Sequence, residues 1–285
     1  MDRIARQALV QAARSGSDCV LVQVERIEGS APREAGAAMV VTREAAVGTI
    51  GGGHLELKSI ALAREQLEQA AHNPGLVRRF PLGPSLGQCC GGVAYIRFDF
   101  CPAGVVPREA PVLVPQPLFD LMLFGAGHVA QALVQVLAAV DCSVTWVDSR
   151  EQQFPAQVPE QVSVEFSEHP ADEVDSAPAG AFYLIMTHSH ALDLAIVERV
   201  LKRGDAGFLG LIGSKTKRVR FERRLTDRGF SAQQIAAIIS PIGAAGIAGK
   251  APGVVAIAAA AQLLEVATRR GEALQSPMIT ASVRP

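Results

Sequence analysis

Two adjacent cysteines lie in a glycine-rich segment, Gly87-Gln88-Cys89-Cys90-Gly91-Gly92. Neighbouring residues are too close for an ordinary unstrained disulfide, and the flanking glycines predict an accessible backbone around both thiols. The thiolate is the form of cysteine that attacks electrophiles and binds metals, and a nearby arginine or helix N-terminus increases its population. This pattern favours Cys89 and Cys90 as soft sulfur ligands or sulfur donors, with a pair of buried structural thiols as the alternative.

A second pattern, Gly125-Ala126-Gly127-His128-Val129-Ala130, follows an apolar stretch and precedes an amphipathic one. Between a strand and a helix, such glycines let backbone N–H groups approach a phosphate, and the helix start adds partial positive charge. Asp148 ends the next apolar stretch, where a ribose-binding carboxylate usually lies. The residues for which we predict contacts with a phosphorylated ligand are Gly125, Gly127, His128 and Asp148. A tight turn without a ligand is the alternative.

Two further polar segments, Thr187-His188-Ser189-His190 and Gly213-Ser214-Lys215-Thr216-Lys217, each follow an apolar run. If these runs are parallel strands, the segments lie at the carboxyl edge of the sheet, which faces the ligand crevice. The residues for which we predict ligand contacts there are His188, His190, Ser214 and Lys215. The alternatives are a helix N-cap for the histidine segment and a solvated helix face for the basic one.

The N-terminal part carries another glycine run, Gly51-Gly52-Gly53-His54, directly before a predicted helix. Consecutive glycines are entropically costly unless the backbone must approach another group closely. We predict an anion-holding turn at these four residues, with a plain flexible turn as the alternative. Arg33, in Gly29-Ser30-Ala31-Pro32-Arg33, adds a guanidinium that can bind a phosphate through two hydrogen bonds.

The elements that must position these residues fall on either side of a proline-rich stretch. Residues 102–118 contain Pro102, Pro107, Pro111, Pro115 and Pro117, which predict an extended linker. Residues 1–101 predict a smaller α+β domain that includes the cysteine pair. In residues 119–285, apolar strands alternate with amphipathic helices, which indicates an α/β domain with a Rossmann-like, doubly wound parallel sheet covered on both faces.

Hydrophobic periodicity places the individual elements. In the first domain we expect a helix capped by Asp2, a helix at Leu55–Ala71, and strands at Cys19–Ile27, Ala38–Thr42, Leu76–Phe80 and Val93–Phe100. In the second we expect strands at Phe119–Phe124, Ser143–Val147, Val162–Phe166, Ala181–Met186 and Gly207–Ile212. The helices expected there are Val129–Val140, Ala191–Arg203, Lys215–Asp227, a short one capped by Ser231, and one from Pro252 to Arg270.

Composition excludes several classes of protein. The 285 residues include 27 basic and 28 acidic side chains, a net charge of -1, which argues against a nucleic-acid binder, as does an aromatic content of 5%. The odd number of cysteines, 5, in a chain of this size argues against a disulfide scaffold and indicates a reducing cytoplasm. The uncharged stretch 121–140 contains Gly125 and Gly127 near its start, so it fits a strand, turn and helix better than a membrane span.

Together these segments resemble one family, the xanthine dehydrogenase accessory proteins of the XdhC/CoxI type. The resemblance runs nearly end to end. It is carried by Gly29–Arg33, Gly48–Glu56, Gly87–Gly92, Gly125–Val129, Val147–Arg150, Thr187–Asp193, Gly210–Lys217 and Pro241–Gly243. The resemblance implies binding of molybdenum cofactor, its protection, its delivery to xanthine dehydrogenase, and cooperation with a sulfurtransferase that installs a terminal sulfido ligand.

The resemblance also implies roles for residues. Gln88, Cys89 and Cys90 would lie near the molybdenum, with both cysteines as metal contacts. Gly91 would contact the cofactor, and the two glycine turns would contact the phosphate. One departure bears on this expectation. The family pattern continues after Val129 with glycine and a basic residue, where this chain has Ala130 and Gln131. A charged phosphate contact from the first helical turn is therefore in doubt.

We thus expect a cytoplasmic maturation chaperone for molybdenum cofactor, in its molybdopterin form, rather than a catalyst. Its partners would be apo-xanthine dehydrogenase or a related molybdoenzyme and a cysteine desulfurase or sulfurtransferase, with no nucleic acid and no membrane, and a homodimer is permitted. The main alternative is an NAD(P)-dependent oxidoreductase with Asp148 on the ribose. A metal-dependent hydrolase built on His54, His188 and His190 is the third hypothesis.

Overall fold

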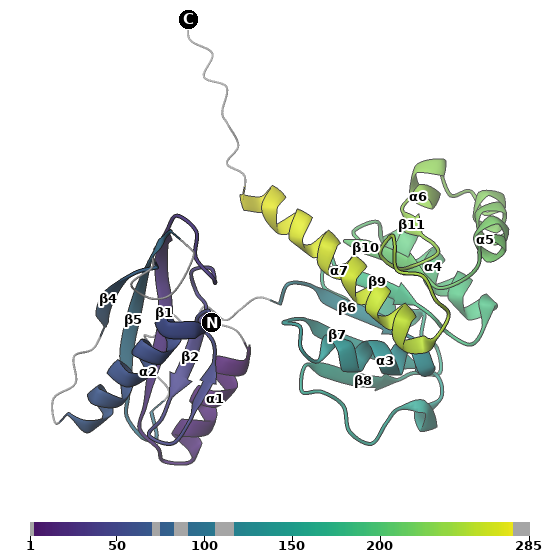
Figure 1. Ribbon diagram of the computed structural model, residues 1–285. Helices are drawn as coiled ribbons and strands as arrows, with labels where there is room; N and C mark the ends of the chain where they lie inside the picture. Colours follow the sequence, from purple (N-terminus) through teal and green to yellow (C-terminus); the bar gives the residue numbers. More distant parts are fainter. Residues whose placement is uncertain (1–2, 70–74, 83–90, 106–116, 276–285) are drawn as a thin grey trace, which may run out of the picture. The chain divides into compact units, whose positions relative to one another are not determined.

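The computed structural model describes residues 3–69, 75–82, 91–105 and 117–275. The chain divides into two compact units, Met1–Gln116 and Pro117–Pro285 (Figure 1). The division falls inside the predicted linker, residues 102–118, of which 106–116 lie outside the described residues. Each unit has its own hydrophobic core, so the two are described separately.

The first unit is a five-stranded antiparallel sheet with one helix on each face (Figure 1). In chain order its elements are α1 (Arg3–Arg14), β1 (Cys19–Glu28), β2 (Ala38–Val41), β3 (Ala46–Gly48), α2 (Gly53–Glu68), β4 (Leu76–Pro81) and β5 (Val93–Cys101). The strand order is β3-β2-β1-β5-β4. Side chains of the central strand β1 alternate between two cores, because successive residues of a strand point to opposite faces. Val20 and Val22 pack with Leu55 of α2, whereas Leu21 packs with Leu9 of α1.

The second unit is a six-stranded parallel sheet. Its elements are β6 (Asp120–Phe124), α3 (His128–Leu137), β7 (Ser143–Asp148), β8 (Val162–Phe166), β9 (Phe182–Ile185), α4 (His190–Arg203), β10 (Phe208–Leu211), α5 (Lys215–Asp227), α6 (Ala232–Ala236), β11 (Ile238–Ile239) and α7 (Pro252–Gln275). The strand order is β11-β10-β9-β6-β7-β8. The chain first adds β7 and β8 on one side of β6, and then adds β9, β10 and β11 on the other side. This order confirms the predicted doubly wound fold.

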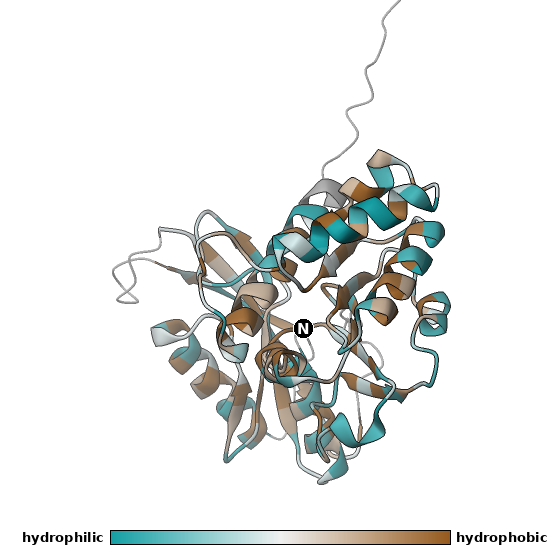
Figure 2. Cartoon of the chain, turned by 90° about the vertical axis from the view of Figure 1, so that its right-hand side faces the viewer, coloured by the Kyte–Doolittle hydropathy of each residue, from teal (hydrophilic) through white to brown (hydrophobic). Residues whose placement is uncertain are grey.

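Helices cover both faces of the parallel sheet. Trp146 packs on one face in a core shared with α3 and α7, and Tyr183 packs on the other face with α4 and α5. Figure 2 shows the consequence: the strands contain long apolar stretches, while the helices carry both apolar and polar residues. The change of winding direction between β6 and β9 opens the carboxyl edge of the sheet, where the predicted ligand residues of this unit lie.

Most predicted elements are present, and the differences lie in short elements and helix ends. The sequence analysis missed β3 and β11, which have 3 and 2 residues and are too short to show a period. It extended α2 to Ala71 and α3 to Val140, whereas these helices end at Glu68 and Leu137. The predicted cap Asp2 lies outside the described residues. None of the helices in the described part of the chain could cross a bilayer.

Candidate functional site

The turn between β6 and α3 requires a glycine at position 125. Gly125 has φ +107, and a Cβ built there would lie 2.4 Å from the carbonyl oxygen of Met186. The absence of a side chain thus lets the turn approach the end of β9. Gly127 is the N-cap of α3, but it supplies no side-chain cap, and nothing lies within 4 Å of a Cβ built on it. The first N–H groups of α3 therefore have no side-chain acceptor from the N-cap residue, and the glycine at that position leaves room for a ligand.

Asp148 holds this turn in place. Its side chain is buried, and one carboxylate oxygen accepts the N–H of Ala126 at 2.6 Å. Arg150 donates to both oxygens through Nε and Nη2, at 2.9 and 2.8 Å. Burial alone would raise the pKa of Asp148, but the hydrogen bonds from Arg150 and Ala126 outweigh it and leave the pKa below its usual value. The carboxylate is thus already bound by protein groups, and the ribose contact stays a prediction.

A pocket of about 410 Å³ lies beside the glycine turn. Its lining includes the first residues of two helices, His128 of α3 and Pro252 of α7, together with Trp146 and Gln131. Both of these last side chains donate to the turn: Trp146 Nε1 to the carbonyl of Gly125 at 2.9 Å, and Gln131 Nε2 to that of Ala126 at 3.1 Å. Position 131, where the family pattern has a basic residue, therefore carries a neutral side chain that braces the turn.

The histidine segment after β9 is fixed by a buried ion pair that the sequence analysis missed. His188 and His190 are both exposed. Behind them, one oxygen of Asp193 accepts the backbone N–H and hydroxyl of Thr187, at 3.0 and 2.7 Å. The other oxygen pairs with Lys217 Nζ at 2.6 Å, and Lys217 also donates to the carbonyl of Ile212 at 2.7 Å.

The basic segment before α5 contains lysines in two different environments. Ser214 is the N-cap of α5 and accepts the N–H of Lys217. Lys215 is exposed at the first helical position, whereas Lys217 is buried against Asp193. The signal that could have found this pair was the presence of an acid in the first turn of α4 and a lysine in the first turn of α5, after adjacent strands.

In the first unit, the structure brings three glycine-containing segments together. A Cβ built on Gly92 would lie 2.2 Å from the carbonyl oxygen of Ser30, and one built on Gly51 would lie 2.7 Å from Cβ of Pro32. The end of the cysteine-containing segment and the helix-preceding glycine run therefore both contact the segment 29–33. Arg33 is half-buried and pairs with the exposed Glu34. Gly91 is exposed. Gln88, Cys89 and Cys90 lie outside the described residues.

The glycine run before α2 already holds an anion from its own helix. Glu56 Oε2 accepts the N–H groups of Ile50 and Gly52, at 3.2 and 2.9 Å, and the hydroxyl of Thr49 at 2.7 Å. The N–H of Gly51 donates to Thr49 Oγ1 at 3.1 Å. The N–H groups of Gly51 and Gly52 are thus paired within the chain, whereas Gly53 and His54 are exposed. The ligand contact at these four residues stays a prediction.

Within the described residues, no group of three or more histidine, cysteine or acidic side chains could hold a metal ion. Cys19, Cys101 and Cys142 are buried, and none of the three forms a disulfide. Cys19 and Cys101 are partners across β1 and β5, and the hydrogen bond between them and burial raise the pKa of Cys101. A raised pKa keeps that thiol protonated and unreactive.

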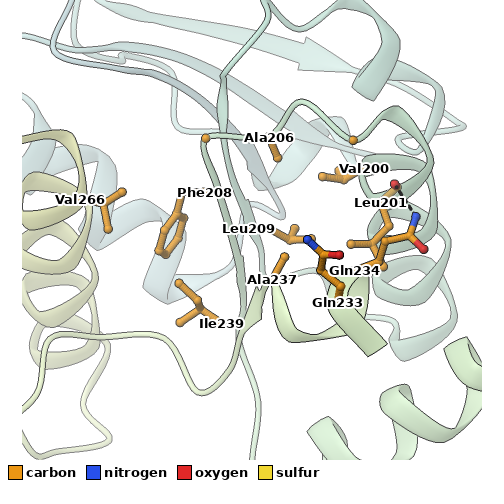
Figure 3. Close-up of a pocket in the computed structure, with 12 residues that line it drawn as sticks. Val200, Leu201, Ala206, Phe208, Leu209, Gln233, Gln234, Ala237, Ile239 and Val266 are labelled. Carbon is orange, nitrogen blue, oxygen red and sulfur yellow. Dashed lines mark hydrogen bonds between the residues drawn. The ribbon is translucent and has the colours of Figure 1, made fainter. Parts of the chain in front are cut away.

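A largely apolar pocket of about 370 Å³ lies beside the start of β10, away from the carboxyl edge of the parallel sheet (Figure 3). Leu201 of α4, Phe208 of β10 and Val266 of α7 contribute to it. Gln234 reaches the carbonyl of Leu201 at 3.4 Å, as the dashed line in Figure 3 shows. None of the sequence-predicted ligand residues lines this pocket, so the candidate site is at the carboxyl edge.

Comparisons with known proteins give one consistent family. The pattern of the XdhC and CoxI family matches residues 12–80, and that of the XdhC Rossmann domain matches residues 121–263. The Escherichia coli K12 protein YqeB, described as uncharacterized, is 28% identical over 251 residues. These cover 86% of this chain but only 43% of that protein. A crystal structure described as that of a xanthine dehydrogenase from Bacillus halodurans is 20% identical, with a TM-score of 0.72 over 95% of this chain and 97% of that one. At that identity it shows the shared fold.

Proposed function

The chain belongs to the XdhC and CoxI family, and on that basis we propose that it binds molybdenum cofactor and serves the maturation of xanthine dehydrogenase or a related molybdoenzyme. The proposed cargo is the molybdopterin form. The proposed partners are the apoenzyme and a sulfurtransferase, in the cytoplasm. Protection, sulfuration support and insertion of the cofactor are parts of the same proposal.

The observation that carries the proposal is the open helix start beside the 410 Å³ pocket. Molybdenum cofactor carries a phosphate, and the N–H groups at the start of α3 are suited to an anion because Gly127 gives no side-chain cap. No acidic side chain lies in the first turn of α3 to repel it. Gly125, Gly127 and His128 are therefore the proposed phosphate contacts, and Gln131 adds an amide without a charge.

The remaining proposed contacts follow from residue type and spacing. Soft thiolates are chemically suited to a molybdenum centre, so Cys89 and Cys90, with Gln88, are proposed for the metal end. Further proposed cofactor contacts, all from the sequence, are Arg33, Gly51, Gly52, Gly53, His54, Gly91, Asp148, His188, His190, Ser214 and Lys215. Bound cofactor would supply the redox-active metal centre, and the residues of this chain would hold and release it.

Anaerobic purification tests the proposal. The protein, co-expressed with its molybdoenzyme, should carry pterin fluorescence and molybdenum in a fixed ratio. Gly127→Ala should lose most of the bound pterin, because its methyl group enters the space where the phosphate approaches. Gly271→Ala is the matched control, since a Cβ there also meets no atom within 4 Å. Equal pterin content in both variants would remove the glycine turn from the site.

A Cys89→Ala/Cys90→Ala double variant tests the metal end separately. If the thiols contact molybdenum, the variant should keep the pterin but lose molybdenum or fail to activate the apoenzyme. Normal activation by the variant would show that these thiols have no part in the process. Light scattering would determine whether the protein is a homodimer.

The NAD(P)-dependent oxidoreductase remains the competing hypothesis, because the strand order is that of dinucleotide-binding domains. The geometry of Asp148 does not favour it, since a ribose hydroxyl would have to compete with Ala126 and Arg150 for the carboxylate. Titration with NAD and NADP distinguishes the two: saturable binding in the micromolar to sub-millimolar range would favour the oxidoreductase.

A further inference from the structure

A small pocket of about 150 Å³ lies between the starts of α4 and α5. It is separate from the pocket beside the glycine turn, because the two share no lining residue. Its polar lining consists of His190, Ser214, Thr216, Lys217, Arg220 and Arg224. Of the described residues that line it, none is acidic. The pocket therefore offers hydrogen-bond donors from two helices and positive charge from the side chains of α5.

The positive charge of this pocket is only partly compensated within the unit. Lys217 pairs with Asp193. Arg220 and Arg224 are exposed, and no carboxylate in the described part of the chain forms an ion pair with either of them. They lie one helical turn apart, where like charges repel each other. An external anion would relieve this repulsion.

The start of α5 adds to the imbalance. Helix starts favour acidic residues, because the N–H groups there carry partial positive charge. The first turn of α5 has no acidic residue and instead contains Lys215, Lys217 and Arg218. The first turn of α4 contains Asp193, as expected for a helix start. The cationic start of α5 lowers the stability of the helix, and binding of an anion would compensate for that loss.

We propose that this pocket binds a tetrahedral oxyanion of the phosphate type. Guanidinium groups bind phosphate oxygens through paired hydrogen bonds, and the hydroxyls of Ser214 and Thr216 are additional donors. The pocket, of about 150 Å³, has room for one such group. The ligand is either free inorganic oxyanion or the phosphate end of an organic molecule that reaches in. The proposal does not rest on the cofactor function.

Calorimetric titration of the full chain at constant ionic strength, in chloride buffer, tests the pocket. The probes are inorganic phosphate and glycerol 3-phosphate. Wild-type protein should bind phosphate saturably, and an Arg220→Gln/Arg224→Gln variant should bind it at least about tenfold more weakly, since two charge-assisted contacts are lost. Both arginines are exposed, so the variant should fold. Tighter binding of one probe identifies the source of the oxyanion.

Two controls make the result specific. Arg223→Gln removes an exposed arginine of the same helix that does not line the pocket, and it should leave the affinity within about twofold. Gly127→Ala alters the glycine turn and should leave this binding intact even if the cofactor proposal fails. Absence of saturable binding would overturn the proposal. So would an equal loss in Arg223→Gln, which would indicate diffuse charge attraction, or a loss only in Gly127→Ala.

Discussion

Two glycine-rich turns precede helices in this chain, one in each unit, and they differ in what binds their N–H groups. In the turn before α2, the carboxylate of Glu56 accepts the N–H groups of Ile50 and Gly52. In the turn before α3, Asp148 accepts a single N–H of the turn, that of Ala126, and the helix start has no side-chain cap. The first turn is closed by its own acid, whereas the second is open.

The difference shows that a glycine run before a helix does not by itself identify a phosphate site. The fourth residue of the helix determines whether the N–H groups of the turn are already bound. In α2 this residue is Glu56, whose carboxylate lies over the turn and accepts them. The corresponding position of α3 is Gln131, which binds a carbonyl group of the turn instead of its N–H groups. A neutral amide there leaves the helix start available to an anion.

The largest expected effect comes from the glycine that shapes the open turn. Gly125→Ala should destabilise the second unit by about 3–5 kcal/mol, because a left-handed backbone conformation and a clash with the carbonyl of Met186 add together. Gly127→Ala should cost less than about 1 kcal/mol, because Gly127 has φ -75 and open space around it. Denaturant unfolding measures both. Similar losses in the two variants would contradict the account of the turn.

The next effect concerns Asp148, which braces the open turn. Asp148→Asn should cost about 2–3 kcal/mol at pH 7, through the loss of charge-assisted hydrogen bonds. Because the folded-state pKa is lowered from 3.8, the wild-type contribution is present above that value and is lost as pH falls through the folded-state pKa. The difference between wild type and variant in unfolding free energy should therefore shrink below about pH 4. A constant difference in unfolding free energy down to pH 2 would argue against this role of the ionised Asp148 carboxylate.

A substitution with a smaller expected effect should open the turn before α2. Glu56→Ala should destabilise the first unit by about 1–2 kcal/mol, because the donors of Thr49, Ile50 and Gly52 lose their acceptor. Phosphate should then raise the melting temperature of the variant more than that of the wild type. Glu65→Ala, at an exposed position of the same helix, is the control. If phosphate stabilises both variants equally, the turn is no anion site even when emptied.

The smallest expected effect is a gain in phosphate affinity at the open turn before α3. Gln131→Lys should increase phosphate affinity at the start of α3 by about two- to fivefold, since an exposed ion pair between the lysine and the phosphate contributes up to about 1 kcal/mol. Gln135→Lys, one turn further along in the same pocket, should have a weaker effect. Titration of both variants in the Arg220→Gln/Arg224→Gln background isolates this turn from the second pocket.

Periodicity and turn residues predicted much of the fold. The apolar strands and amphipathic helices after residue 119 predicted the doubly wound sheet, and the helix at Lys215–Asp227 has the predicted ends. The two-residue strand β11 could not be predicted, because it has no period and exists only through its pairing with β10. The approach of Gly92 to Ser30 and of Gly51 to Pro32 was likewise not predicted, since it depends on how distant segments pack.

By itself, the sequence determined which segments are strands, which are helices, and where glycines and acids lie along the chain, because these depend on local residue type and spacing. Only the tertiary structure decided which donors were already bound. It placed Glu56 over one turn, buried Lys217 against Asp193, and committed Asp148 to Arg150 and Ala126. A hydrogen bond needs its partners at about 3 Å, and for distant segments that proximity is set by the packing of the sheet and its helices.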